Sequence, residues 1–214
     1  AVSDGIRYQP TAYPAAPTTM LGVFYLDATH AWSSGTGTIA AFDGANWVTQ
    51  TPGVTGNLEQ VVFANATTGW AVGVSGVIRT TTNGGATWVG QTSGTTSSLR
   101  EIDCVSTTTC VTVGAGGTIR ATTNGGTNWN GQTSGTTQAL WDVDCVSSTT
   151  CWIVGGAGVI RKTVNGGATW TNQTPGGFTT RLRGVSCVDA LRCWAVGDGG
   201  AVRTTADGGT TWTP

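Results

Sequence analysis

The chain has 214 residues, of which 34 are glycine and only 10% are charged. Ordinary domains have about 7% glycine and about 25% charged residues. The 38% hydrophobic content and ten tryptophans nevertheless support a packed core rather than a linker or disordered tail. A net charge of −1 argues against nucleic-acid binding, and no apolar run approaches the ~18 residues of a membrane helix. A single histidine excludes His-rich metal sites. Together, these features lead us to expect no metal, cofactor, nucleic acid or membrane insertion.

The first predicted element in chain order is an extension over residues 1–19. Residues 6–9 resemble the later segment 47–50, which we predict to be a strand. We therefore expect residues 5–10 to pair near the end of the fold and close it. No charged-then-apolar segment starts the chain, so we expect that any export signal has been removed.

A repeated unit of about 41 residues begins at residue 20. Its clearest mark is a segment ending in tryptophan, seen at residues 81–88 (TTNGGATW), 122–129 (TTNGGTNW), 163–170 (TVNGGATW) and 205–212 (TADGGTTW). A shorter copy, FDGANW, occupies residues 42–47, and the tryptophans are spaced by 41, 41, 41 and 42 residues. The chain therefore contains five copies of one structural unit.

Each unit predicts four short strands. In the third copy, apolar and β-branched runs at 99–105, 110–113, 118–122 and 129–133 are separated by turn residues that include Gly-Gly and Asn-Gly. Four antiparallel strands repeated at this period are typical of a β-propeller blade. We predict an all-β fold, a single five-bladed β-propeller of four-stranded antiparallel blades over residues 20–214. The predicted blades span about 20–52, 58–93, 99–134, 140–175 and 182–214.

The tryptophan segments resemble a known repeat. Their pattern S/T-x-D/N-x-G-x-T-W is similar to the Asp-box, or bacterial neuraminidase repeat, and residues 182–212 resemble the repeats of the photosystem II assembly factor family. This resemblance, over roughly residues 20–214, implies that the segment forms the peripheral turn between strands three and four, capped by the Asp or Asn side chain. It assigns structural roles to Asp43, Asn83, Asn124, Asn165 and Asp207. It does not fix activity, because Asp-boxes occur in sialidases, sortilin-type receptors, xyloglucanases and assembly factors.

The six cysteines form three C-x5-C pairs that recur in the last three units. The pairs are Cys104/Cys110, Cys145/Cys151 and Cys187/Cys193. Each brackets the loop between the first two strands, so local disulfides are the favoured pairing among the 15 possible. A zinc site would need ligands from several blades and a different spacing. Disulfides indicate a secreted or otherwise extracytoplasmic protein.

Residues that break the repeat are candidates for function, whereas recurring residues such as Arg79, Arg120, Arg161 and Arg203 are expected to be structural. The starts of the innermost strands, which meet at one mouth of the central channel, carry most off-pattern charges and Trp141. The predicted ligand-binding residues are Glu59, Arg100, Glu101, Trp141, Asp142 and Arg183, and Arg181 adjoins them. One interpretation is a polar rim of mutually paired charges. The other is a binding site with Trp141 as an aromatic platform.

Enzymatic interpretations have little support in the sequence. Sialidase-type chemistry needs a tyrosine nucleophile, but Tyr25 aligns with the cysteine positions, away from the mouth, and Tyr8 and Tyr13 precede the repeats. His30 lies in a predicted hairpin loop and is poorly placed to activate a nucleophile. We predict a non-enzymatic secreted binding module or scaffold with a protein or glycan ligand. The alternative is a lectin-like propeller, and a sialidase-like glycoside hydrolase is less favoured.

Overall fold

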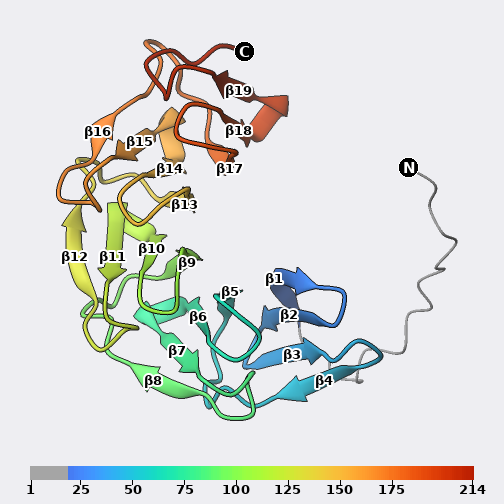
Figure 1. Cartoon of the computed structure of the whole chain (residues 1–214). Coiled ribbons are helices and arrows are strands. Elements are labelled where there is room, and N and C mark those ends of the chain that lie inside the picture. Colours follow the sequence, from blue (N-terminus) through green and yellow to red (C-terminus); the bar gives the residue numbers. More distant parts are fainter. Residues whose placement is uncertain (1–18) are drawn as a thin grey trace, which may run out of the picture.

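The structure is a computed structural model that describes residues 19–214. They form five small antiparallel sheets, each with its strands in sequence order (Figure 1). The all-β fold with propeller blades is therefore confirmed. The predicted closing strand at residues 5–10 lies outside the described residues.

Four blades have four strands and the fifth has three. Blade 1 contains β1 (Met20–Asp27), β2 (His30–Gly35), β3 (Thr38–Phe42) and β4 (Trp47–Gln50). Blade 2 contains β5 (Leu58–Phe63), β6 (Gly69–Gly73), β7 (Ile78–Thr81) and β8 (Val89–Gln91). Blade 3 contains β9 (Leu99–Cys104), β10 (Cys110–Gly114), β11 (Thr118–Thr122) and β12 (Asn130–Thr133). Blade 4 contains β13 (Leu140–Cys145), β14 (Cys151–Gly155), β15 (Ile160–Thr163) and β16 (Thr171–Asn172).

Blade 5 contains β17 (Leu182–Cys187), β18 (Cys193–Gly197) and β19 (Val202–Thr205). Thr213 pairs with Thr204 at the place where a fourth strand would run. Helical structure in the described chain is limited to single 3-10 turns between the second and third strands of blades 2–5. They are η1 (Val74–Gly76), η2 (Ala115–Gly117), η3 (Gly156–Gly158) and η4 (Asp198–Gly200).

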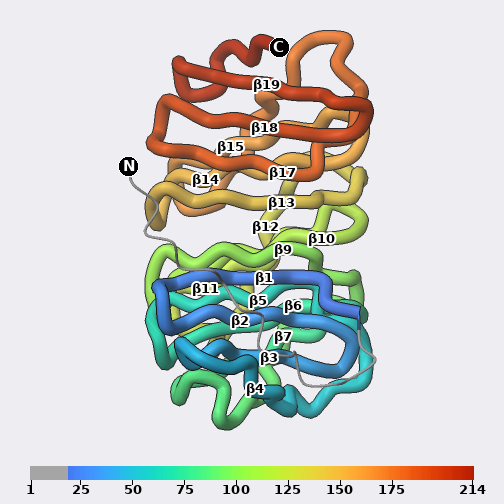
Figure 2. The backbone as a smooth tube through the Cα atoms, turned by 90° about the vertical axis from the view of Figure 1, so that its right-hand side faces the viewer, coloured from blue at the N-terminus to red at the C-terminus, as the bar shows by residue number. Residues whose placement is uncertain are grey.

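The five blades form an arc with their first strands on the concave side (Figures 1 and 2). Successive first strands contact one another from β1 to β17. Within residues 19–214, no strand pairing joins blade 1 to blade 5, and Figure 1 shows the two blades apart. The predicted five blades are present, but hydrogen bonds among the described strands do not close the ring.

The hydrophobic core is divided among the blade–blade junctions. Between blades 1 and 2, Trp32 stacks on Phe63 with ring centroids 3.5 Å apart, and Leu58 and Val61 complete the contact. The second-strand tryptophans Trp32, Trp70 and Trp152 are fully buried at such junctions. Trp194 is the exception at 44% exposure, because no described blade lies beyond blade 5.

The Asp-box turns have the expected structure. Asn83 Oδ1 accepts the Thr87 N–H at 3.0 Å, and Asn124, Asn165 and Asp207 accept the equivalent amides in their own blades. In the shortened first copy, Asp43 accepts the N–H groups of Ala45 and Asn46. The structural roles implied by the resemblance are confirmed for all five residues.

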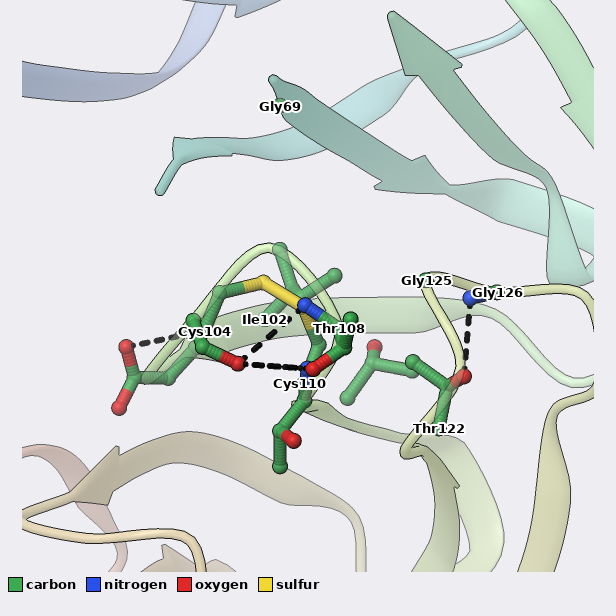
Figure 3. Close-up of a disulfide and its surroundings, with 12 residues drawn as sticks. Gly69, Ile102, Cys104, Thr108, Cys110, Thr122, Gly125 and Gly126 are labelled. Carbon is green, nitrogen blue, oxygen red and sulfur yellow. Dashed lines mark hydrogen bonds between the residues drawn. A yellow bond between two sulfur atoms is a disulfide. The ribbon is translucent and has the colours of Figure 1, made fainter. Parts of the chain in front are cut away.

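The three predicted disulfides are present. Each joins residues that face each other across the first hairpin of its blade, at Cys104–Cys110, Cys145–Cys151 and Cys187–Cys193. Figure 3 shows the first bridge beside the Asp-box turn, where Thr122 Oγ1 accepts the Gly126 N–H. In blade 2 the same positions hold Phe63 and Gly69, and the Phe63 ring covers Gly69 so closely that an added Cβ would lie 2.6 Å from it. An aromatic contact thus takes the place of the disulfide in this blade.

The recurring arginines connect neighbouring blades. Arg79 donates to Gly53 O at 2.9 Å, Arg120 to Gly94 O at 2.6 Å, and Arg161 to Ser134 O at 2.9 Å. Each acceptor lies in the loop that leads out of the preceding blade. Arg203 instead stacks on Phe178, with 4.2 Å from Cζ to the ring centroid. These contacts agree with the expected structural role.

Candidate functional site

A β-bulge occurs at the start of the first strand in every blade. In blade 4, Leu140 pairs with Gly155 and Asp142 with Val154, which leaves Trp141 as the extra residue. The extra residues of the other blades are Leu21, Glu59, Arg100 and Arg183. A bulge re-aims side chains out of the regular strand alternation. Glu59, Arg100, Trp141 and Arg183 therefore share one backbone feature, whereas Glu101 and Asp142 follow the bulge in regular pairing.

Trp141 lies at the centre of an arginine cluster. The guanidinium carbon of Arg100 lies 4.0 Å from the centroid of the Trp141 ring, and those of Arg183 and Arg181 lie 5.2 and 5.4 Å away. These distances are in the range of cation–π attraction. Trp141 is half-buried and Arg183 is exposed. The structure therefore brings three blades together around one indole ring.

Asp198 is the acidic member of this group. We call the group the Trp141 cluster; it consists of Arg100, Trp141, Arg181, Arg183 and Asp198. The Asp198 carboxylate accepts a hydrogen bond from Arg183 Nε, and its Oδ2 lies 3.5 Å from Arg181 Nε. The bond to Arg183 holds the pKa of Asp198 below its usual value. Three permanent positive charges are therefore opposed by one carboxylate within the cluster.

Glu101 and Asp142, also predicted for the site, accept hydrogen bonds from the first strands that line the concave side. Asp142 accepts the Val143 N–H at 2.8 Å and the Val185 N–H of the next blade at 2.6 Å. Glu101 accepts from the Ile102 N–H and from Gln60 Nε2 at 3.1 Å. Burial raises the pKa of Glu101 to about 8 and that of Asp142 to about 7. Both carboxyls therefore carry less negative charge near neutral pH than exposed ones do.

Glu59 occupies the bulge position of β5. Among residues 19–214, Glu59 forms no ion pair, so its position relates it to the mouth through the shared bulge rather than through a contact with the Trp141 cluster. Of the six predicted residues, the structure thus groups Arg100, Trp141 and Arg183 directly and places Glu101 and Asp142 in the adjoining wall.

Asp103 and Asp144 are further buried carboxylates that the repeat comparison missed. Asp103 Oδ2 accepts the Cys145 N–H and Asp144 Oδ2 accepts the Cys187 N–H, both at 2.7 Å and both from the next blade. These amides lie on the free edge of an innermost strand, where a buried N–H needs an acceptor. Burial raises the pKa of Asp103 to about 6 and raises that of Asp144. Both line a hollow of about 280 Å³ together with Gln60 and Glu101.

Sequence signals exist for the missed residues. The position of Asp198 holds Val74, Ala115 and Gly156 in the other 3-10 turns, and that of Arg181 holds Asn57, Ser98 and Ala139. Arg181 was already noted beside the predicted site, and extending the repeat comparison from the first strands to the 3-10 turns would have found Asp198 as well. Asp103 and Asp144 occupy the same position of the repeat, which holds Val62 in blade 2 and Ser186 in blade 5.

The residues considered for hydrolysis lie elsewhere. Tyr25 pairs with Ala31 near the far end of the first hairpin, and His30 bonds Asp27 in the adjoining turn at 2.9 Å. Neither lies at the bulge end of the strands, where Trp141 is found.

Family comparison supports the assignment of the repeats. Residues 127–214 match the family described as photosynthesis system II assembly factor YCF48. The match covers blades 4 and 5 and the end of blade 3. The resemblance to Asp-box propellers of this family is confirmed. No curated protein matches the sequence.

Solved structures share the fold at low identity. "YCF48 bound to D1 peptide" is 20% identical with a TM-score of 0.71, and the alignment covers 92% of this chain and 68% of that one. "YCF48 from Cyanidioschyzon merolae" is 16% identical with a TM-score of 0.62, covering 93% and 86%. A GH74 enzyme from Niastella koreensis is 20% identical with a TM-score of 0.69, but the alignment covers 92% of this chain and only 38% of the enzyme. At these identities the likeness establishes the propeller fold alone. In the described chain no helix is long and apolar enough to span a membrane.

Proposed function

We propose that this protein is a non-enzymatic, extracytoplasmic binding module that holds an acidic segment of a protein partner at the channel mouth. Arg100, Trp141 and Arg183 contact the partner, and Arg181 adds a third guanidinium. The observation that carries the proposal is the convergence of three arginines on one half-buried indole.

The charge balance of the mouth favours an anionic ligand. Asp198 offsets one of the three arginine charges, and the raised pKa values of Glu101 and Asp142 reduce their negative charge near neutral pH. Arginine binds carboxylates through paired, charge-assisted hydrogen bonds. Tryptophan and arginine are also the residues most often found at binding hot spots. A partner carboxylate placed over Trp141 would bind the arginines, and the neighbouring part of the partner would contact the indole ring.

The remaining predicted residues have supporting roles in this proposal. Asp142 bonds the Val185 amide, two residues after Arg183, and so positions the strand that carries this arginine. Glu101 holds Gln60 and the start of β9. Glu59 stands at the bulge of β5, where it can meet a basic or polar group of the partner beyond its acidic segment.

Relatives and disulfides support a protein partner outside the cytoplasm. One of the similar solved structures is YCF48 bound to D1 peptide, which is a precedent for peptide binding by this type of propeller. Three disulfides suit an oxidising compartment.

A glycan ligand is the second candidate. The loop from β8 to β9 and the turn η1 line a hollow of about 740 Å³ whose walls include Arg79, Gln91, Thr92 and Ser93. Hydroxyl, amide and guanidinium groups of this kind can bind sugar hydroxyls. This candidate places the ligand beside η1 and the β8–β9 loop rather than on Trp141, so the two can be separated by mutation.

The test is binding of the full chain to a peptide array and a glycan array, followed by titration calorimetry with the best acidic peptide. Trp141→Ala should weaken peptide binding by about 1–3 kcal/mol and leave the thermal unfolding midpoint nearly unchanged. Arg192→Ala is the matched control, because Arg192 pairs with Asp189 in the β17–β18 turn, at the other end of β17 from Arg183. Binding of glycans alone, or equal losses in both variants, would reject the proposal.

A further inference from the structure

Blade 5 carries an apolar face that no described residue covers. Trp194, Val196 and Val202 are 44%, 50% and 47% exposed. The equivalent side chains of blade 4 are fully buried; they are Trp152, Val154 and Ile160. A large apolar patch on a protein surface commonly marks an interaction site.

Blade 1 exposes the face by which the other blades pack on the blade before them. Val23 and Tyr25 of β1 are 67% and 68% exposed. Their equivalents in blade 2 are Val61 and Phe63, which are almost fully buried against blade 1. The two ends of the arc therefore expose different surfaces.

The four blade–blade junctions show what each surface accepts. At the junction of blades 4 and 5, Trp152, Val154 and Ile160 pack against Leu182 and Val185 of the next first strand. The junction of blades 1 and 2 pairs Trp32 and Ile39 with Leu58, Val61 and Phe63 in the same way. The open faces of blades 5 and 1 are thus the two halves of an interface that this chain already builds four times.

We propose that a second copy of this chain packs its blade 1 face, with Val23 and Tyr25, against the blade 5 face, with Trp194, Val196 and Val202. This association goes beyond the proposed partner binding and does not use the Trp141 cluster. It is head-to-tail, because the two faces differ, and such contacts form rings or open spirals according to their rotation.

Direct closure between the described blades 1 and 5 is disfavoured by the packing of the arc. The angle between successive blades is set by four buried clusters, and close-packed cores resist such repacking. Figure 1 shows blades 1 and 5 apart. The blade 5 face is therefore open to a second copy.

Sedimentation velocity of the full chain over a wide concentration range tests the proposal. We expect concentration-dependent dimers and larger species. Val23→Lys and Val196→Lys each change a largely exposed side chain on one face, and each should weaken association about tenfold or more. An equimolar mixture of the two variants should form a two-chain complex that grows no further, because each variant keeps one intact face.

The matched control is Val89→Lys on β8, which changes a valine of 62% exposure that belongs to neither cluster at the arc ends. It should associate like the unmodified chain, and circular dichroism should show that all three variants are folded. A chain that stays monomeric throughout would overturn the proposal. So would a mixture that does not recover the two-chain complex, or a control that dissociates like the other variants.

Discussion

The indole N–H of Trp129 donates to Gln91 Oε1 at 2.9 Å, although the two residues belong to neighbouring blades and are 38 positions apart. The amide of the same Gln91 side chain donates to Gly125 O at 2.8 Å. Gly126 adopts φ +86°, and an added Cβ there would lie 2.0 Å from Gln91 Oε1. The second glycine of the Asp-box therefore leaves room for a glutamine from the blade before.

Replacing this glutamine should loosen one junction. Gln91→Met should lower the free energy of unfolding by about 1–3 kcal/mol, because it leaves a buried indole N–H and a carbonyl without partners. Gln173→Met is the matched control, since the Gln173 amide donates to the exposed Thr171 hydroxyl. Urea denaturation should show the smaller loss for Gln173→Met, and equal losses would contradict the role of the Gln91 contact.

The buried carboxyls predict that the protein is more stable in mild acid than at pH 8. Burial raises the pKa of Glu101 to about 8, of Asp142 to about 7 and of Asp103 to about 6. The folded state therefore binds these protons more tightly than the unfolded chain, and the free energy of unfolding falls as pH rises from about 4 to about 8.

Exposed carboxyls act in the opposite direction at lower pH. Hydrogen bonds lower the pKa of Asp27, Asp189 and Asp207 to about 2, so their contribution is lost as pH falls from about 4 to about 2. Urea denaturation across this range should give a maximum near pH 4–5. Glu101→Gln should reduce the decline toward pH 8, and a stability that rises from pH 5 to 8 would refute the assignment.

Removing one disulfide should weaken but not abolish folding. Cys104→Ala with Cys110→Ala should lower the free energy of unfolding by about 2 kcal/mol, the loop-closure contribution of so short a loop. Blades 1 and 2 already fold without a bridge at these positions, with Tyr25/Ala31 and Phe63/Gly69. Thermal melting should remain cooperative at a lower temperature; loss of the far-ultraviolet β-sheet signal at room temperature would show that the bridge is essential.

In blade 2, packing of Gly69 against the Phe63 ring takes the place of the disulfide. Gly69→Ala should destabilise the protein by about 1–3 kcal/mol, because the new methyl group meets the Phe63 ring. Gly53→Ala is not a suitable control, since Gly53 has φ +71°. Gly176, with no atom within 4 Å of its added Cβ and no positive φ, is the better one. A Gly69→Ala protein as stable as Gly176→Ala would contradict this packing.

Asp198 should compete with an acidic ligand for the arginines. Asp198→Asn removes the carboxylate bonded to Arg183 and close to Arg181, so affinity for an acidic peptide should rise several-fold at low salt and less at high salt. Asp189→Asn, which breaks the Arg192 pair in the β17–β18 turn, should leave affinity unchanged. A fall in affinity for Asp198→Asn would mean that Asp198 positions the arginines rather than shielding them.

The predictable parts of the fold are those specified within one repeat. Asp-box turns and disulfides depend on residues a few positions apart. Comparing copies was therefore enough to assign the Cys104–Cys110 pair, and the resemblance to the Asp-box assigned Asn124. The bulges at Arg100, Trp141 and Arg183 depend on the pairing register of two strands, which composition does not reveal. The role of Asp142 depends on an amide of the next blade, and the opening of the arc depends on the angles at all four junctions together.

Among residues 19–214, the hydrogen bonds between blades reach nearest neighbours only. They run from glutamine to the next Asp-box, from arginine to the preceding loop, and from aspartate to the next inner strand. A chain linked in this way behaves as a one-dimensional array, in which each unit is stabilised by the units on either side. Amides of the middle blades should therefore exchange with solvent most slowly. Because every junction uses the same types of contact, a whole blade can be inserted or deleted during evolution without a new type of contact.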